Sequence, residues 1–137
     1  MGPFHGDRVI YRIYNAYVKP VLTYNSSTWG ITNTKLKGLE SFHRAQLRRV
    51  LGAHHPEHIS NDAVYLRSEC LPLRYDIIQA RWNCFGGILR SDPKIPANVE
   101  MEGYFICEEQ RQLGRKLTCM PICLHKDLTT INGKLST

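Results

Sequence analysis

The stretch TKLKGLESFHRAQLRRVL, residues 34–51, carries the pattern that decides the fold. Its apolar residues recur every three or four positions, which is the period of an amphipathic helix. Asn33 or Thr34 can cap the start of this helix, and Gly52 directly after it is a common helix stop. We therefore predict a helix over about residues 34–51, with an apolar side made by Leu36, Leu39, Phe42, Leu47, Val50 and Leu51.

Helical periodicity also dominates the rest of the chain, and strand-like alternation is weak. We predict helices over about 7–22, where Pro20 indicates a kink or an early end, over a short stretch after Ser60 or Asn61, and over about 73–90. The expected fold is all-α, with a small bundle of about four helices at 1–92 and a loosely ordered extension at 93–137 that holds one short helix over about 121–131. The first of these helices has one apolar face, formed by Val9, Ile10, Ile13, Tyr14, Tyr17 and Val21.

The segment LTYNSSTWG, residues 22–30, interrupts the helical pattern. Asn25-Ser26-Ser27 fits the acceptor motif for N-glycosylation, but these residues also favour a turn because their side chains bond nearby backbone groups. The start of the chain lacks the apolar core of a signal peptide, and five cysteines are an odd count for a disulfide framework. We interpret the segment as a joint anchored by Tyr24 and Trp29, in a protein that is not secreted.

The net charge of +6 is concentrated in the first part of the chain. Residues 1–52 hold eight Lys or Arg against two acids, whereas residues 53–137 hold ten of each sign. Such a basic region indicates a polyanionic partner, either nucleic acid or an anionic membrane surface, with a solvated basic surface as the alternative. No apolar run is long enough to span a bilayer. Of the two kinds of partner we expect nucleic acid and no membrane.

Positive side chains form a stripe beside the apolar side of the predicted helix 34–51. At about 100° per residue, Lys37, Arg44 and Arg48 fall within about 40° of one another, and Lys35 and Arg49 lie on the opposite flank. A stripe of this kind can contact successive phosphates and supplies affinity without sequence readout.

Arg81 lies within the apolar face of the predicted helix 73–90. A cation there must pair with another group or extend to the surface. The partner is either an internal carboxylate, such as Asp76 or Glu69, or a phosphate. The nearby pair Gly86-Gly87 indicates close approach of another group to this helix.

Motifs for catalysis and metal binding are weak. Cys107, Cys119, Cys123 and His125 lack the spacing of a zinc finger, and His54, His55 and His58 are better explained as a surface loop. Neither a nucleophile elbow nor a phosphate-binding loop occurs, and the only adjacent acids are Glu108-Glu109. We predict no enzyme activity, no metal and no cofactor.

Several blocks in order along the chain resemble the region that follows the polymerase palm in non-LTR (LINE-type) retrotransposon reverse transcriptases. The first is similar to that family's Y-x-x-x-V-x-P-x-L-x-Y-G-x-x-x-W. The second is similar to L-x-x-F-x-x-x-x-L-R-x-I-L-G, and the third to R-x-x-x-x-G-H-[IV]-L-R. The matching residues are Tyr14, Val18, Pro20, Leu22, Tyr24 and Trp29, then Leu39, Phe42, Leu47, Arg48, Leu51 and Gly52, and finally Arg81, Gly86, Ile88, Leu89 and Arg90.

Departures from the family patterns limit what the resemblance implies. Asn25 and Gly87 stand where the family usually has Gly and His, and the chain has no Y/F-x-D-D motif for the polymerase aspartates. The resemblance therefore implies a non-catalytic thumb and post-thumb region that grips the backbone of an RNA/DNA duplex, with a polymerase palm domain as a possible missing partner. A helical protein-interaction module, or a decayed remnant without independent activity, is the alternative. The expected nucleic-acid contacts are Lys37, Arg44 and Arg48, followed by Lys35, Arg49, Arg81 and Arg90.

Overall fold

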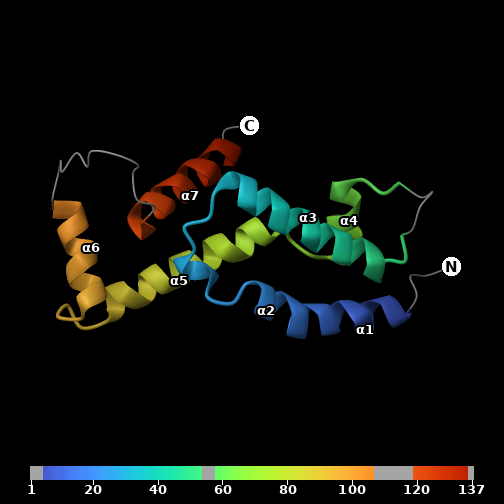
Figure 1. Ribbon diagram of the computed structural model, residues 1–137, viewed down its shortest axis with the longest axis horizontal. Coiled ribbons are helices and arrows are strands. Elements are labelled where there is room, and N and C mark those ends of the chain that lie inside the picture. The colour runs from blue at the N-terminus through green and yellow to red at the C-terminus, as the bar shows by residue number, and fades with distance from the viewer. Residues whose placement is uncertain (1–4, 54–57, 107–118, 136–137) are drawn as a thin grey trace. The chain divides into compact units, whose positions relative to one another are not determined.

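The computed structural model describes residues 5–53, 58–106 and 119–135, and every regular element within these ranges is helical (Figure 1). This confirms the all-α prediction for the described residues. With the continuous segment α1–η1–α2 counted as one helix, the described residues hold six helices, four of them within residues 1–92, where about four were predicted. The elements in order are α1 His5–Ile13, the π-helical turn η1 Tyr14–Val18, α2 Lys19–Leu22, the 3₁₀ turn η2 Ser26–Thr28, α3 Asn33–Val50, α4 Asn61–Ser68, α5 Leu73–Arg90, α6 Pro96–Ile106 and α7 Met120–Leu135.

The chain packs as two compact units. Unit 1 comprises residues 1–25 and 31–77, and unit 2 comprises residues 26–30 and 78–137. The helix α5 begins in unit 1 and continues in unit 2. The predicted division at residue 92 stays a prediction.

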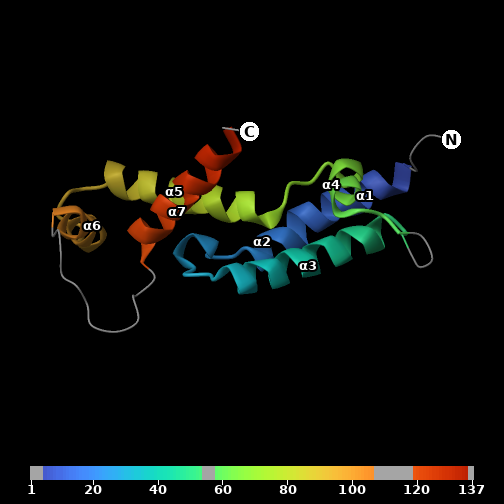
Figure 2. The same cartoon turned by 90° about the horizontal axis from the view of Figure 1, so that it is seen from above.

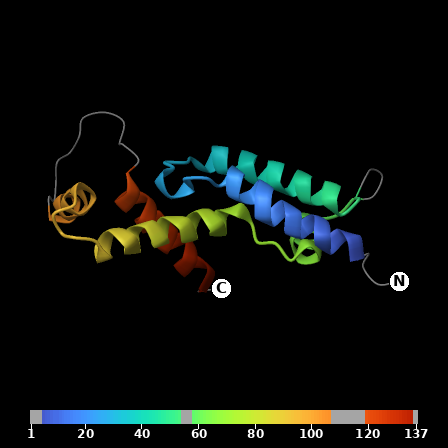
Figure 3. The ribbon, with the colours of Figure 1, turned by 90° about the horizontal axis from the view of Figure 1, so that it is seen from below.

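In unit 1, the segment α1–η1–α2 runs antiparallel to α3, and α4 packs against α3 (Figures 2 and 3). The side chains of Leu47 and Val64 are fully buried between these helices. Burial of a side chain of this size stabilises a fold by about 1.5–3 kcal/mol. The core is completed by Tyr11, Tyr14 and Cys70.

Both ends of α3 are closed by local hydrogen bonds. The Thr32 hydroxyl accepts from the Lys35 backbone N–H at 3.4 Å, so the cap lies slightly before the predicted Asn33 or Thr34. Gly52 has φ of 64°, and its N–H donates to the Arg49 carbonyl while the next N–H, of Ala53, donates to the Arg48 carbonyl. This pair of bonds is a Schellman motif, and it confirms Gly52 as the stop signal.

Two glycines of this region should respond to alanine substitution with opposite signs. Gly52→Ala is expected to lower the free energy of unfolding by about 1 kcal/mol, because an L side chain is strained at positive φ. Gly38→Ala, in the interior of α3 with nothing near an added Cβ, is expected to raise it by about 0.5–1 kcal/mol. Urea unfolding followed by far-UV circular dichroism measures both changes, and equal effects would contradict this account.

Pro20 does not end the first helix, which continues past it. The helix passes through η1, where the Lys19 N–H donates to the Tyr14 carbonyl five residues earlier, and it ends at Leu22. A proline ring collides with the carbonyl four residues before it, here that of Ala16, and a wider turn relieves this clash.

The first helix buries a different side from the predicted apolar face. Of the six residues on the predicted apolar face only Tyr14 is buried, together with Tyr11, which that face did not include. The π turn shifts the period of 3.6 residues only for residues within or after it, such as Tyr17 and Val21. The other five residues of that face are exposed, namely Val9, Ile10, Ile13, Tyr17 and Val21.

The segment 22–30 forms turns, but its anchors differ from those predicted. Asn25 adopts φ of 53°, and Ser26 is buried. Tyr24 is 80% exposed, so it does not anchor the joint. Trp29 is half-buried, and its N–H donates to the Ser26 carbonyl at 3.2 Å.

In unit 2, α7 crosses α5, and α6 follows the end of α5 (Figures 1 and 2). The predicted extension therefore holds two helices in its described part, where one was expected. The helix α6 was not predicted, because its residues show little helical periodicity, although Pro96 stands at the first helical position, where a proline is favourable. The second helix, α7, covers the predicted stretch 121–131 and is longer at both ends.

Candidate nucleic-acid interface

The exposed cations of α3 lie along two edges of one face. Lys35, Lys37 and Arg49 are exposed, and none has an ion-pair or hydrogen-bond partner for its side chain among the described residues. By helical geometry Lys35 and Arg49 share one edge, about 21 Å apart along the axis, and Lys37 lies on the other edge.

Glu40 is the one acidic residue of α3, and it faces inward. Its Oε2 lies 3.4 Å from Arg44 Nη1, and its Oε1 accepts from the backbone N–H of Arg74 at 3.2 Å. Only 13% of the side chain is exposed. The outer face of α3 therefore carries positive charge without an opposing carboxylate of its own.

Two members of the predicted stripe of Lys37, Arg44 and Arg48 bond to other described residues of the chain, and only Lys37 does not. Arg44 pairs with Glu40 and also lies 3.5 Å from the Tyr65 hydroxyl. Arg48 Nη2 donates to the Ile59 carbonyl at 3.2 Å and to Asn61 Oδ1 at 2.7 Å. Both arginines thus hold α3 to the α4 region. The partners of Arg48 are neutral, so its positive charge is retained.

Small residues occupy the face between the two basic edges. At about 100° per residue, the arc between the edges is filled by side chains that are all exposed. A Cβ placed on Gly38 would meet nothing within 4 Å, so this part of α3 is open. The four residues are Thr34, Gly38, Ser41 and Ala45.

Arg81 is buried in unit 2, where its guanidinium forms an ion pair with Asp127 of α7. The predicted alternative of an internal carboxylate is thus found, but with a different partner. Asp76 instead pairs with Lys19, with Nζ and Oδ2 2.9 Å apart. The Arg81 guanidinium is buried and bonded to Asp127, so it is not available to bind a phosphate. We therefore leave Arg81 out of the candidate interface.

Arg90 is exposed at the end of α5 and lies apart in sequence from the α3 residues. A Cβ on Gly86 would lie 3.1 Å from Arg90 Nη1. The glycine thus leaves room for the guanidinium to lie over the last turn of its own helix. This explains one member of the Gly86-Gly87 pair, and nothing lies within 4 Å of a Cβ on Gly87.

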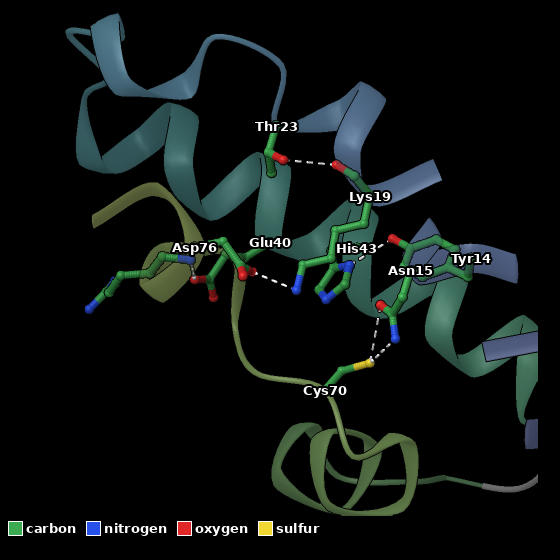
Figure 4. A network of polar contacts seen from close by, with 9 residues as sticks. Tyr14, Asn15, Lys19, Thr23, Glu40, His43, Cys70 and Asp76 are labelled. Carbon is green, nitrogen blue, oxygen red and sulfur yellow. Dashed lines mark hydrogen bonds and ion pairs between the residues drawn. The ribbon is translucent and has the colours of Figure 1, made fainter. Parts of the chain in front are cut away.

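A polar network that the sequence analysis did not identify lies behind the interface, between α3 and the first helix (Figure 4). The Tyr14 hydroxyl lies 2.7 Å from Nδ1 of His43, which is fully buried. Asn15 contacts Cys70 Sγ at 3.6 Å. One signal was available in the sequence, because His43 is four residues from both Leu39 and Leu47 and so shares their inward face.

Burial sets the protonation states in this network. It lowers the pKa of His43 to about 4, an effect that Lys19 and Arg44 reinforce and that Asp76 and the Leu71 carbonyl oppose. Burial likewise raises the pKa of Tyr14 to about 12. The ring of His43 is therefore neutral near pH 7, and its Nδ1 shares a hydrogen bond with the Tyr14 hydroxyl. The network is therefore a structural contact between α3 and the first helix.

Metal binding and membrane insertion gain no support from the described residues. No group of three or more His, Cys, Asp or Glu in the described ranges could hold a metal ion, and Cys70, Cys84, Cys119 and Cys123 are free thiols. The predicted candidates Cys107, His54 and His55, together with Glu108-Glu109, lie outside the described residues. No described helix has the length and apolar content needed to cross a bilayer.

Comparison with known proteins finds no matching family model, no matching curated protein and no matching solved structure.

Proposed function

We propose that this chain is a nucleic-acid-binding helical module that holds the phosphate backbone of an RNA/DNA duplex on the outer face of α3. In this proposal it performs no reaction itself. It acts as the thumb and post-thumb part of a non-LTR retrotransposon reverse transcriptase does in the family that the sequence resembles, in the cytoplasm or nucleus. The observation that carries the proposal is the arrangement of α3, with three unpartnered cations on its outside and its single acid turned inward.

The shape of the face supports backbone contact rather than base readout. The small side chains between the two basic edges let a phosphate chain approach the helix closely, and the Ser41 hydroxyl can donate to a phosphate oxygen. Lys35 and Arg49, about 21 Å apart, span several phosphates of one strand. Arg48 adds charge from the same side as Lys37, although its geometry is set by its bonds to Ile59 and Asn61.

Charge reversal at the three free cations tests the proposal. We expect K35E/K37E/R49E to weaken binding to an RNA/DNA duplex by about a hundredfold at low salt. With three phosphate contacts, the wild-type affinity should fall about fortyfold between about 50 and 200 mM salt, and the variant should lose most of this dependence. Fluorescence anisotropy with a labelled duplex measures both quantities.

The control is R12E/K94E/K126E, which changes the net charge equally at exposed cations that are not part of α3. It should retain most of the affinity, and circular dichroism should show unchanged helix content in both variants. Arg44 and Arg48 are unsuitable for this test, since their reversal would also break contacts to the α4 region. Equal loss of binding in both triple variants would indicate nonspecific attraction, and it would count against the α3 face.

A protein-interaction module is the second candidate function, and one observation favours it. The outward side of α1–η1–α2 exposes a row of large apolar side chains, which is unusual for a surface that faces only water. A polymerase palm domain is one partner that the family resemblance suggests. Duplex affinity that does not change with salt, or no duplex binding at all, would favour this function over the first.

A further inference from the structure

The outward side of the first helix carries one continuous apolar face. Val9, Ile13, Tyr17 and Val21 are 54%, 51%, 72% and 77% exposed, and Tyr24 just beyond the helix is 80% exposed. Ile10 and Val18 flank this row and are also exposed. We call these seven residues the α1 stripe, and none of them carries a charge at neutral pH.

The π turn keeps the α1 stripe on one side of the helix. In a regular α-helix each step of four residues advances about 40° past a full turn, so a row with this spacing winds around the surface. In η1 the backbone hydrogen bonds join residues five positions apart instead of four, so each turn holds more residues than a turn of α-helix. A step of four residues through η1 therefore rotates by less than a full turn. The two deviations oppose each other, and Val9, Ile13, Tyr17 and Val21 remain on the exposed side together.

A row of this spacing is complementary to a second copy of itself. Residues four apart form a ridge, and two such ridges interdigitate in the commonest class of helix packing. If two copies pair antiparallel about Asn15, Val9 meets Val21 of the other copy and Ile13 meets Tyr17. Arg12 then lies opposite Val18, so the described residues of the face bring no like charges together.

The size of the α1 stripe also fits a pair of identical chains. Its exposed fractions correspond to on the order of 700 Å² per copy, close to the roughly 800 Å² that each partner contributes to a standard specific interface. The opposite side of the helix is occupied, since Tyr14 there bonds His43 of α3. The outer face of α3 therefore lies away from the stripe.

We propose that two copies of this chain associate antiparallel through the α1 stripe, about a two-fold axis near Asn15. The dimer presents two copies of the α3 face, so it would bind a long duplex at two places. The association itself does not depend on the proposed function, because the two faces are separate.

Analytical ultracentrifugation of the full chain from about 1 to 100 μM tests this proposal. The wild type should form dimers within this range. I13E/Y17E should raise the dimer dissociation constant by on the order of a hundredfold, because it places carboxylates at the centre of an apolar contact. The control L66E/L71E alters two apolar side chains that are 81% and 63% exposed elsewhere in unit 1, and it should dimerise as the wild type does.

A charge-pair experiment tests the antiparallel register. V9K and V21E should each weaken association by about tenfold, and V9K/V21E should recover much of this loss because each new Lys meets a Glu of the other copy. Parallel pairing would bring like charges together and weaken the double variant further. Three results would each overturn the proposal. They are a wild type that stays monomeric over the whole concentration range, a wild type that forms assemblies larger than dimers, and an I13E/Y17E variant that dimerises as the wild type does. A monomeric wild type would indicate that the α1 stripe binds a different protein.

Discussion

Replacement of Arg81 by Met or of Asp127 by Leu is expected to lower the free energy of unfolding of unit 2 by about 3–5 kcal/mol. The two residues are only 5% and 7% exposed, and they join α5 to α7. Removal of one partner leaves the other charge buried without compensation, and this is much more costly than the loss of an exposed ion pair.

The double variant R81M/D127L separates this explanation from a simple loss of packing. With both charges replaced by apolar groups of similar size, most of the lost stability should return. Tryptophan fluorescence during urea unfolding isolates unit 2, because Trp29 and Trp82 are the only tryptophans and both belong to it. R90M, at an exposed position of the same helix, is the control and should change little. Single variants as stable as the wild type would show that the ion pair adds no stability.

Local signals along the chain predicted much of the helical structure. The pattern of residues 73–90 gave the bounds of α5, and Ser60 caps α4 as expected, accepting from the Ala63 N–H at 3.2 Å. These features depend on neighbouring residues alone. The exceptions involve groups that local patterns do not link, since Asp127 is 46 residues from Arg81 in the chain. The π turn was missed for a different reason, because the analysis applied one period to the whole helix.

The candidate site was predictable only in part, because local patterns do not link residues that are far apart in the chain. Helical spacing placed Lys35, Lys37 and Arg49 on two flanks of α3, and all three are exposed. Spacing alone did not show that Arg44 and Arg48 bond to residues 11–21 positions further along the chain. A cation beside an apolar face reaches across to the next helix when acceptors lie there, and only the tertiary packing reveals those acceptors.

Acidification should destabilise unit 1 through His43. Burial holds the pKa of His43 at about 4, below the ordinary value of 6.5, so the unfolded chain binds this proton more readily than the folded chain. The stabilisation is complete above about pH 6.5 and is lost as the pH falls towards 4. At about 1.4 kcal/mol per pH unit, the loss attributable to His43 amounts to about 3 kcal/mol.

The variant H43Q isolates this contribution from that of other groups near the site, such as the carboxylates of Asp76 and Glu40. Gln does not titrate, and its amide oxygen can still accept from the Tyr14 hydroxyl. Urea unfolding followed by far-UV circular dichroism, at intervals from pH 7.5 to 4, gives stability against pH for both proteins. The wild type should lose about 3 kcal/mol more than H43Q across this range. The proton NMR signal of the His43 ring is identified as the histidine signal that is missing from the spectrum of H43Q, and it should titrate near pH 4. Titration of that signal near pH 6.5, together with parallel curves of stability against pH for the two proteins, would contradict the burial of a neutral His43.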